Sequence, residues 1–129
     1  MKELGIRRTV DLGWDEAVEK VRATLANEGF GVLSEIPIHE KLKEKLGVEF
    51  RRYLILGACN PPLAHKALQS NPEIGLLLPC NVVVYENEGK TVVSAIDPDM
   101  MVAVAGDNPV MKEVAADARA RLERAIAAV

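Results

Sequence analysis

The sequence lacks a surplus of basic residues, a long apolar run and a secretion signal. Its 16 lysines and arginines are outnumbered by 19 aspartates and glutamates, which gives a net charge of −3 at pH 7. Nucleic acids and anionic membranes are usually bound by basic patches, so neither is expected as a partner. No run reaches the ~18 apolar residues of a membrane helix, and MKELGIRRTVDL has no apolar core of signal-peptide length. These features predict a cytoplasmic protein.

The common catalytic motifs are also missing. There is no glycine-rich phosphate loop, no nucleophile elbow and no His-Glu zinc helix. The serines are Ser34, Ser70 and Ser94, and none has a histidine at local spacing. The carboxylates in HEKLKEKLGVE and ARARLERA look like charged helix surfaces rather than an acid–base pair. The sequence therefore leaves open whether the protein is an enzyme.

The composition is that of a globular chain. Of the 129 residues, 49% are hydrophobic and 27% are charged, which is typical of soluble domains. Domains commonly have about 100–200 residues, so residues 1–129 are expected to form a single domain. A chain of this size can bury a core without disulfides or structural metals.

Alternating apolar residues predict the strands. Leu4, Ile6, Val10 and Leu12 share one side of a first strand, and Phe30, Val32 and Ile36 share one side of a second. FRRYLILGA is a third strand with Phe50, Leu54 and Leu56 on one side. NVVVYENEGKTVVSAI is a hairpin that turns between Asn87 and Lys90, with Gly89 at positive φ.

Spacings of three and four residues predict the helices. One begins near Trp14 and stops at Gly29, and a long one follows the capping residue Asn108. Short helices are expected after Pro37 and after Asn60. The whole pattern predicts an α+β fold, in which a mostly antiparallel sheet of about five strands carries two long helices on one face and short helices in the connections.

The central strands are apolar on both sides. Tyr53 and Ile55 alternate with Leu54 and Leu56, and Val83 and Tyr85 alternate with Val82 and Val84. A sheet covered by helices on one side should be polar on the other. Either the segment MMVAVAG or a second copy of the chain is needed to cover the second face. We favour a homodimer through Tyr53, Ile55, Val83 and Tyr85.

The two cysteines, Cys59 and Cys80, are the candidate site. If the third strand and the first hairpin strand are antiparallel, Cys59 ends one and Cys80 begins the next at the same edge of the sheet. The positive end of the nearby helix dipole would favour a thiolate there. Pro61 and Pro62 remove two N–H donors, which argues against a phosphate site. Asn60 and Asn81 are expected to cap or turn the backbone.

Two interpretations of the cysteines remain open. With His65, they form a soft ligand set for zinc or Cu(I), to which Met100 or Met101 would add a thioether, although no zinc-motif spacing is present. The candidate ligand-binding residues are then Cys59, Asn60, His65 and Cys80, and the candidate metal ligands are Cys59, Cys80 and His65. In the other interpretation both cysteines are buried packing residues, His65 faces solvent, and the protein is a non-catalytic dimeric module.

Two motifs resemble a known family. GACNPPLAHKAL and IGLLLPCNVVVYE are similar to the signatures of domain-of-unknown-function family 302, and the resemblance extends over nearly the whole chain. It implies an α/β sandwich built on an antiparallel sheet and association as dimers. The family has no established activity. Its motifs map onto Cys59, Asn60, Pro61, Leu78, Pro79 and Cys80, to which it assigns no certain role.

Overall fold

A five-stranded antiparallel sheet forms the centre of the computed structural model, which describes residues 4–129. The strands follow the order β1-β5-β4-β3-β2, so β1 and β2 lie at the edges. Each pair of neighbours is antiparallel. The strands are β1 (Gly5–Val10), β2 (Gly31–Pro37), β3 (Tyr53–Cys59), β4 (Cys80–Asn87) and β5 (Lys90–Ile96).

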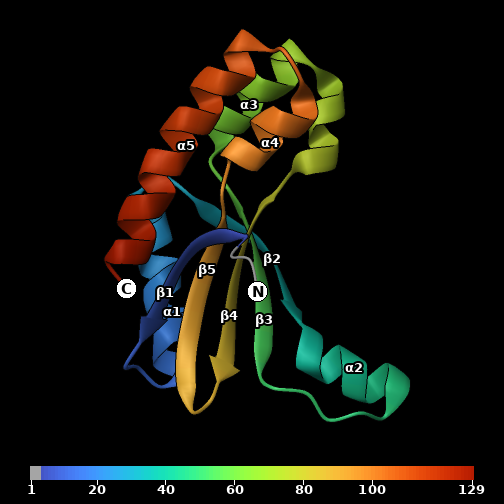
Figure 1. Ribbon diagram of the computed structural model, residues 1–129, viewed down its shortest axis with the longest axis vertical. Coiled ribbons are helices and arrows are strands. Elements are labelled where there is room, and N and C mark those ends of the chain that lie inside the picture. Colours follow the sequence, from blue (N-terminus) through green and yellow to red (C-terminus); the bar gives the residue numbers. More distant parts are fainter. Residues whose placement is uncertain (1–3) are drawn as a thin grey trace.

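The helices lie in two groups relative to this sheet (Figure 1). The long helices pack on one face of the sheet, whereas the short helices α3 and α4 lie beyond its end, beside the first half of α5. The helical elements are α1 (Trp14–Asn27), α2 (Ile38–Leu46), α3 (Pro61–Ser70), the 3₁₀ helix η1 (Pro72–Leu77), α4 (Asp99–Ala105) and α5 (Pro109–Ala127). The predicted α+β fold is confirmed. No helix within residues 4–129 combines the length and apolar character needed to cross a membrane.

The main core fills the space between the sheet and the two long helices. Apolar side chains from β3, β4 and β5 meet the apolar stripes of α1 and α5. Burial of such side chains removes apolar surface from water, which is the main favourable term in folding. The largest contributors include Leu25, Leu54, Leu56, Val84 and Leu122.

A second apolar cluster joins the short helices to α5. Its buried members include Ile74, Cys80, Met101, Met111 and Val114. Because α5 has 19 residues and rises 1.5 Å per residue, it is about 28 Å long. That length lets its first half complete the second cluster while its second half covers the sheet.

Several predicted helix ends and turns are confirmed. The side chains of Asn60 and Asn108 accept hydrogen bonds from the backbone N–H groups three residues later, at Leu63 and Met111, and so cap α3 and α5. In the hairpin turn Glu88 and Gly89 both have positive φ, at 52° and 78°. This is the backbone required by a two-residue turn that matches the twist of the strands. The prediction for Asn81 is wrong, since it lies within β4 opposite Gly57.

The prediction for Ile36 is also wrong, because β2 contains an irregularity. Phe30 and Val32 face the main core as expected. Between Val32 and Ser34 the pairing with β3 shifts, so that Ile36 lies opposite Ile55. One extra residue moves every later side chain of the strand to the other face. Ile36 is therefore on the face opposite the main core and is 41% exposed.

Two further apolar residues are not buried as predicted. Leu4 precedes β1 and is 68% exposed, and Phe50 precedes β3 and is 47% exposed. Each lies just outside the strand whose alternating pattern predicts its burial. The segment MMVAVAG forms α4, which packs against α5. It is therefore not the element that covers the second face of β3 and β4.

Candidate functional site

Cys59 and Cys80 lie at the same end of the sheet on neighbouring strands. β3 ends at Cys59, β4 begins at Cys80, and the register places Ala58 directly opposite Cys80. The segment between the two cysteines carries α3 and η1. It leaves this end of the sheet and returns to it, as the sequence predicts.

The two thiols leave their strands in different directions. Successive side chains of a strand point to opposite faces, so Cys59 starts on the face opposite Ala58 and Cys80. Both residues nevertheless line one cavity of about 30 Å³ at the end of the sheet. A disulfide needs Cβ atoms about 3.5–4.5 Å apart with suitable directions. The opposed starting directions disfavour such a bond, and both cysteines are free.

Burial changes the acidity of Cys80. This side chain is 8% exposed, whereas Cys59 is half-buried. Burial of the sulfur away from water is the main cause that raises the pKa of the Cys80 thiol from 9.0 to about 11, and the nearby Cys59 is the second cause. At pH 7 Cys80 is therefore a neutral thiol. The thiolate expected from the helix dipole is wrong for Cys80, because desolvation dominates.

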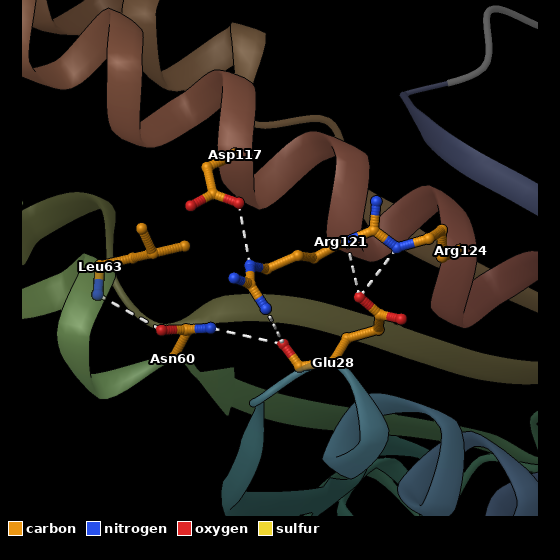
Figure 2. Close-up of polar contacts among 6 residues, drawn as sticks. All are labelled: Glu28, Asn60, Leu63, Asp117, Arg121 and Arg124. Carbon is orange, nitrogen blue, oxygen red and sulfur yellow. Dashed lines mark hydrogen bonds and ion pairs between the residues drawn. The ribbon is translucent and has the colours of Figure 1, made fainter.

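The side-chain oxygen and nitrogen of Asn60 both make hydrogen bonds within the fold. Its Oδ1 accepts a hydrogen bond from the Leu63 N–H at 3.3 Å, and its Nδ2 donates to the Glu28 carbonyl at 3.4 Å (Figure 2). The residue lines the cavity and is 8% exposed. Its polar atoms hold the start of α3 against the end of α1, and the cavity wall depends on that contact.

Sequence reasoning missed the charged residues that complete this junction. Arg121 on α5 donates to the same Glu28 carbonyl at 3.2 Å, and Arg124 pairs with the Glu28 carboxylate at 2.8 Å (Figure 2). Arg124 lowers the pKa of Glu28 through its hydrogen bond and charge. The ends of α1 and α3 are thus both tied to α5. Glu28 and Arg124 lie 96 positions apart, so no local spacing could indicate the pair.

His65 does not join the cysteines. It is exposed on α3 and is not among the residues that line the cavity. Its neighbours Ala64 and Ala67 do line the cavity, and they occupy the inward side of the helix. Within residues 4–129 no group of three or more histidine, cysteine, aspartate or glutamate side chains is placed to hold a metal ion.

A larger surface hollow lies next to the small cavity. This groove has a volume of about 320 Å³ and lies between η1, α4 and the adjoining ends of β4 and β5. Leu78 and Met101 line both the groove and the small cavity, so their side chains form the wall between them. Leu76, Met100 and Val104 give the groove an exposed apolar rim.

The second face of the sheet carries the residues predicted to form a dimer. We call the surface made by Tyr53, Ile55, Val83 and Tyr85 the open face, since all four are only partly buried. Ile55 lies opposite Val83, and Tyr53 lies opposite Tyr85 with the two rings stacked 5.3 Å apart. Burial, and then the neighbouring Tyr85, raises the pKa of Tyr53.

Helix α2 projects to one side of the sheet (Figure 1). None of its nine residues is buried, although Ile38, Leu42 and Leu46 recur at helical spacing. Its start is attached to the sheet by His39, whose Nδ1 accepts a hydrogen bond from the Tyr53 N–H at 3.0 Å. Leu46 at its end is 68% exposed. The apolar side chains of α2 are thus not buried within a single chain.

These features define a class of small α+β proteins with one helix-covered sheet face, one open apolar face and a cysteine-lined cavity at the sheet end. The chain belongs to the family described as "Domain of unknown function DUF302", which it matches over residues 6–129. It is similar to a crystal structure of an uncharacterized conserved DUF302 protein from Bacillus stearothermophilus, with 36% sequence identity and a TM-score of 0.89. That similarity covers 98% of each chain. No curated protein matches the sequence.

Proposed function

We propose that this protein is a homodimeric, non-catalytic module whose contact surface is the open face together with α2. The observation that carries the proposal is that apolar side chains on the second face of the sheet are only partly buried, while α2, which directly follows β2 and contacts β3, has no buried residue. Side chains opposite one another on a sheet share a face, so Ile36, Ile55 and Val83 form a row across β2, β3 and β4. Tyr53 and Tyr85, two positions along β3 and β4 from Ile55 and Val83, form a neighbouring row on the same face.

A two-fold dimer uses both surfaces at once. In such an interface the same patch occurs on both subunits, so α2 of each copy can rest on the open face of the other. Aromatic residues are enriched at the centres of interfaces, and the stacked tyrosines supply them here.

Sedimentation velocity of the purified chain tests this proposal. We expect a dimer that Leu46→Glu converts to a monomer, because Leu46 is 68% exposed and its replacement leaves the core of one chain intact. Ile55→Glu should have the same effect. Ala116→Glu is the matched control, since Ala116 is exposed on α5, away from both surfaces. A monomer at every concentration of the unmodified chain would overturn the proposal.

A second candidate function is a soft-ligand or thiol site in the small cavity. The observation that favours it is that both cysteines line the same hollow. Its ligand would be a soft metal ion or a small electrophile. Ellman titration of the native and the unfolded chain, with the metal content of the purified protein, tests this candidate. Two thiols that stay unreactive in the native protein, with no metal and no binding of an added soft ion, would remove it.

A further inference from the structure

The small cavity collects most of the sulfur of this protein. The chain has 2 cysteines and 4 methionines, and Cys59, Cys80, Met101 and Met111 all line this hollow. Three of them, Cys80, Met101 and Met111, also belong to the same buried cluster between α3, α4 and α5. One thiol and two thioethers, from β4, α4 and α5, therefore belong to residues that share one cavity wall and one buried cluster.

The rest of the cavity wall is unsuited to a hard ion. Apart from the sulfur-bearing residues and Asn60, the lining side chains are alanines, leucines, a phenylalanine, a proline and a valine. The Asn60 side chain is already engaged by Leu63 and Glu28. Hard cations such as Mg²⁺ and Ca²⁺ take oxygen ligands, whereas thiolates and thioethers select Cu(I).

We propose that Cys80, Met101 and Met111 form a binding site for one Cu(I) ion. The Cys80 thiol transfers its proton to water as its sulfur bonds to the ion. The single negative charge of the thiolate balances the single positive charge of Cu(I), and the two thioethers are neutral. The resulting complex has no net charge, so an apolar cavity can hold it at little electrostatic cost.

The Cys80 thiol is available for this bond. It is more than nine-tenths buried, and among residues 4–129 it makes no hydrogen bond that would have to be broken. Cys59 lies near Cys80, but side chains alternate between the two faces along β3, so the Cys59 side chain leaves the backbone toward the face opposite Cys80. We therefore assign the bond to the ion to Cys80 rather than to Cys59.

The neighbouring groove lies against this site. Leu78 and Met101 line both the groove and the cavity and stand between them. Met100 lines only the groove and is 45% exposed. The assignment rests on the second candidate function, the soft-ligand cavity, and is independent of the dimer.

Anaerobic competition for Cu(I) against bicinchoninate tests the assignment. We expect one ion per chain, and sulfur-only coordination in the X-ray absorption spectrum. Removal of a directly bound ligand should weaken affinity by more than the roughly 10–100-fold that loss of an outer partner typically costs. Cys80→Ser should therefore abolish measurable binding. Met101→Leu and Met111→Leu, which conserve volume, should each weaken it by more than about tenfold.

The controls separate this assignment from its alternatives. Met100→Leu should leave the affinity within about threefold of the unmodified chain, well below the loss for a bound ligand. Cys59→Ser should weaken the affinity less than Cys80→Ser does. Circular dichroism melting establishes that each variant is folded, and Cys80→Ala replaces Cys80→Ser where the serine variant does not fold. Absence of Cu(I) binding, unchanged affinity in the Met101 and Met111 variants, or a larger loss in Cys59→Ser than in Cys80→Ser would each overturn it. If Cu(I) fails to bind while Ellman reagent reaches a native thiol, the Cu(I) assignment falls and the thiol cavity stands.

Discussion

Tyr53 and Tyr85 face each other across β3 and β4, with ring centroids 5.3 Å apart and ring planes within 9° of parallel. Aromatic pairs of this kind contribute about 0.5–1.5 kcal/mol beyond the area they bury. A second ring extends the pair, since Phe50 lies 6.3 Å from Tyr53. The open face therefore has an ordered aromatic centre rather than scattered apolar side chains.

A double-mutant cycle measures the energy of this stack. The cycle is measured in the Leu46→Glu background, which is expected to be monomeric. The free energy of unfolding by urea is compared for Tyr53→Ala, Tyr85→Ala and the double variant, and the coupling energy should be about 0.5–1.5 kcal/mol. The comparison cycle pairs Tyr85→Ala with Leu63→Ala, whose side chain packs against the main core from α3. That coupling should be near zero, and equal couplings in the two cycles would contradict the stacking.

Gly29 and Gly47 form a matched pair of helix ends with different surroundings. Both have positive φ, at 84° and 68°, but a Cβ at Gly29 would lie 3.0 Å from Asn60 Nδ2, whereas nothing lies within 4 Å at Gly47. Gly47→Ala should cost about 1–2 kcal/mol for the left-handed backbone alone. Gly29→Ala should cost about 1 kcal/mol more, because it also disturbs the Asn60 cap. Equal losses in urea unfolding would show that the Asn60 contact contributes nothing.

The pKa of Glu28 predicts a difference in acid stability. Arg124 lowers the pKa of this carboxyl in the folded chain, so its contribution is present above the ordinary value of 4.5 and is lost as pH falls through the folded pKa. Glu28→Gln should be less stable than the unmodified chain at pH 7, and the difference should shrink in acid. It should also shrink in high salt, because both partners reach the surface. Glu19→Gln, exposed on α1, is the control and should show neither trend.

The raised pKa of Cys80 predicts that the free energy of unfolding falls at alkaline pH. A pKa raised from 9.0 to about 11 means that the folded chain holds this proton more tightly than the unfolded chain. The associated stability is complete below pH 9 and is lost as pH rises toward 11, by about 2–3 kcal/mol. Cys80→Ser should remove this slope from the curve of unfolding free energy against pH, while Cys59→Ser should keep most of it, because burial is the larger cause of the raised pKa. Parallel curves for Cys80→Ser and the unmodified chain would contradict the burial of the thiol.

Local rules were enough for much of the fold. The caps Asn60 and Asn108, the stop at Gly29 and the turn at Glu88 and Gly89 depend on residues within a few positions of one another. The end-of-sheet position of both cysteines follows from the direction of two neighbouring strands. Such features are readable because the physical cause and its residues lie in one short segment.

The failures have a different origin. The shift in β2 moves Ile36 to the other face, and an alternating pattern contains no mark of an inserted residue. Proximity in sequence predicts that His65 lies with the cysteines, yet the helical turn of about 100° per residue places it away from Ala64 and Ala67. The Glu28–Arg124 pair joins distant segments. Each of these three features depends on how complete helices and strands pack against one another, and a local sequence pattern does not contain that information.

Helix α5 supplies buried side chains to both apolar clusters, with Met111 and Val114 in one and Leu122 and Ile126 in the other. A molecule that occupies the sulfur-lined hollow and binds only the native chain must therefore raise the melting temperature of the sheet as well. Unfolding of the sheet therefore reports occupancy of the hollow, because one continuous helix, α5, contributes side chains to both clusters.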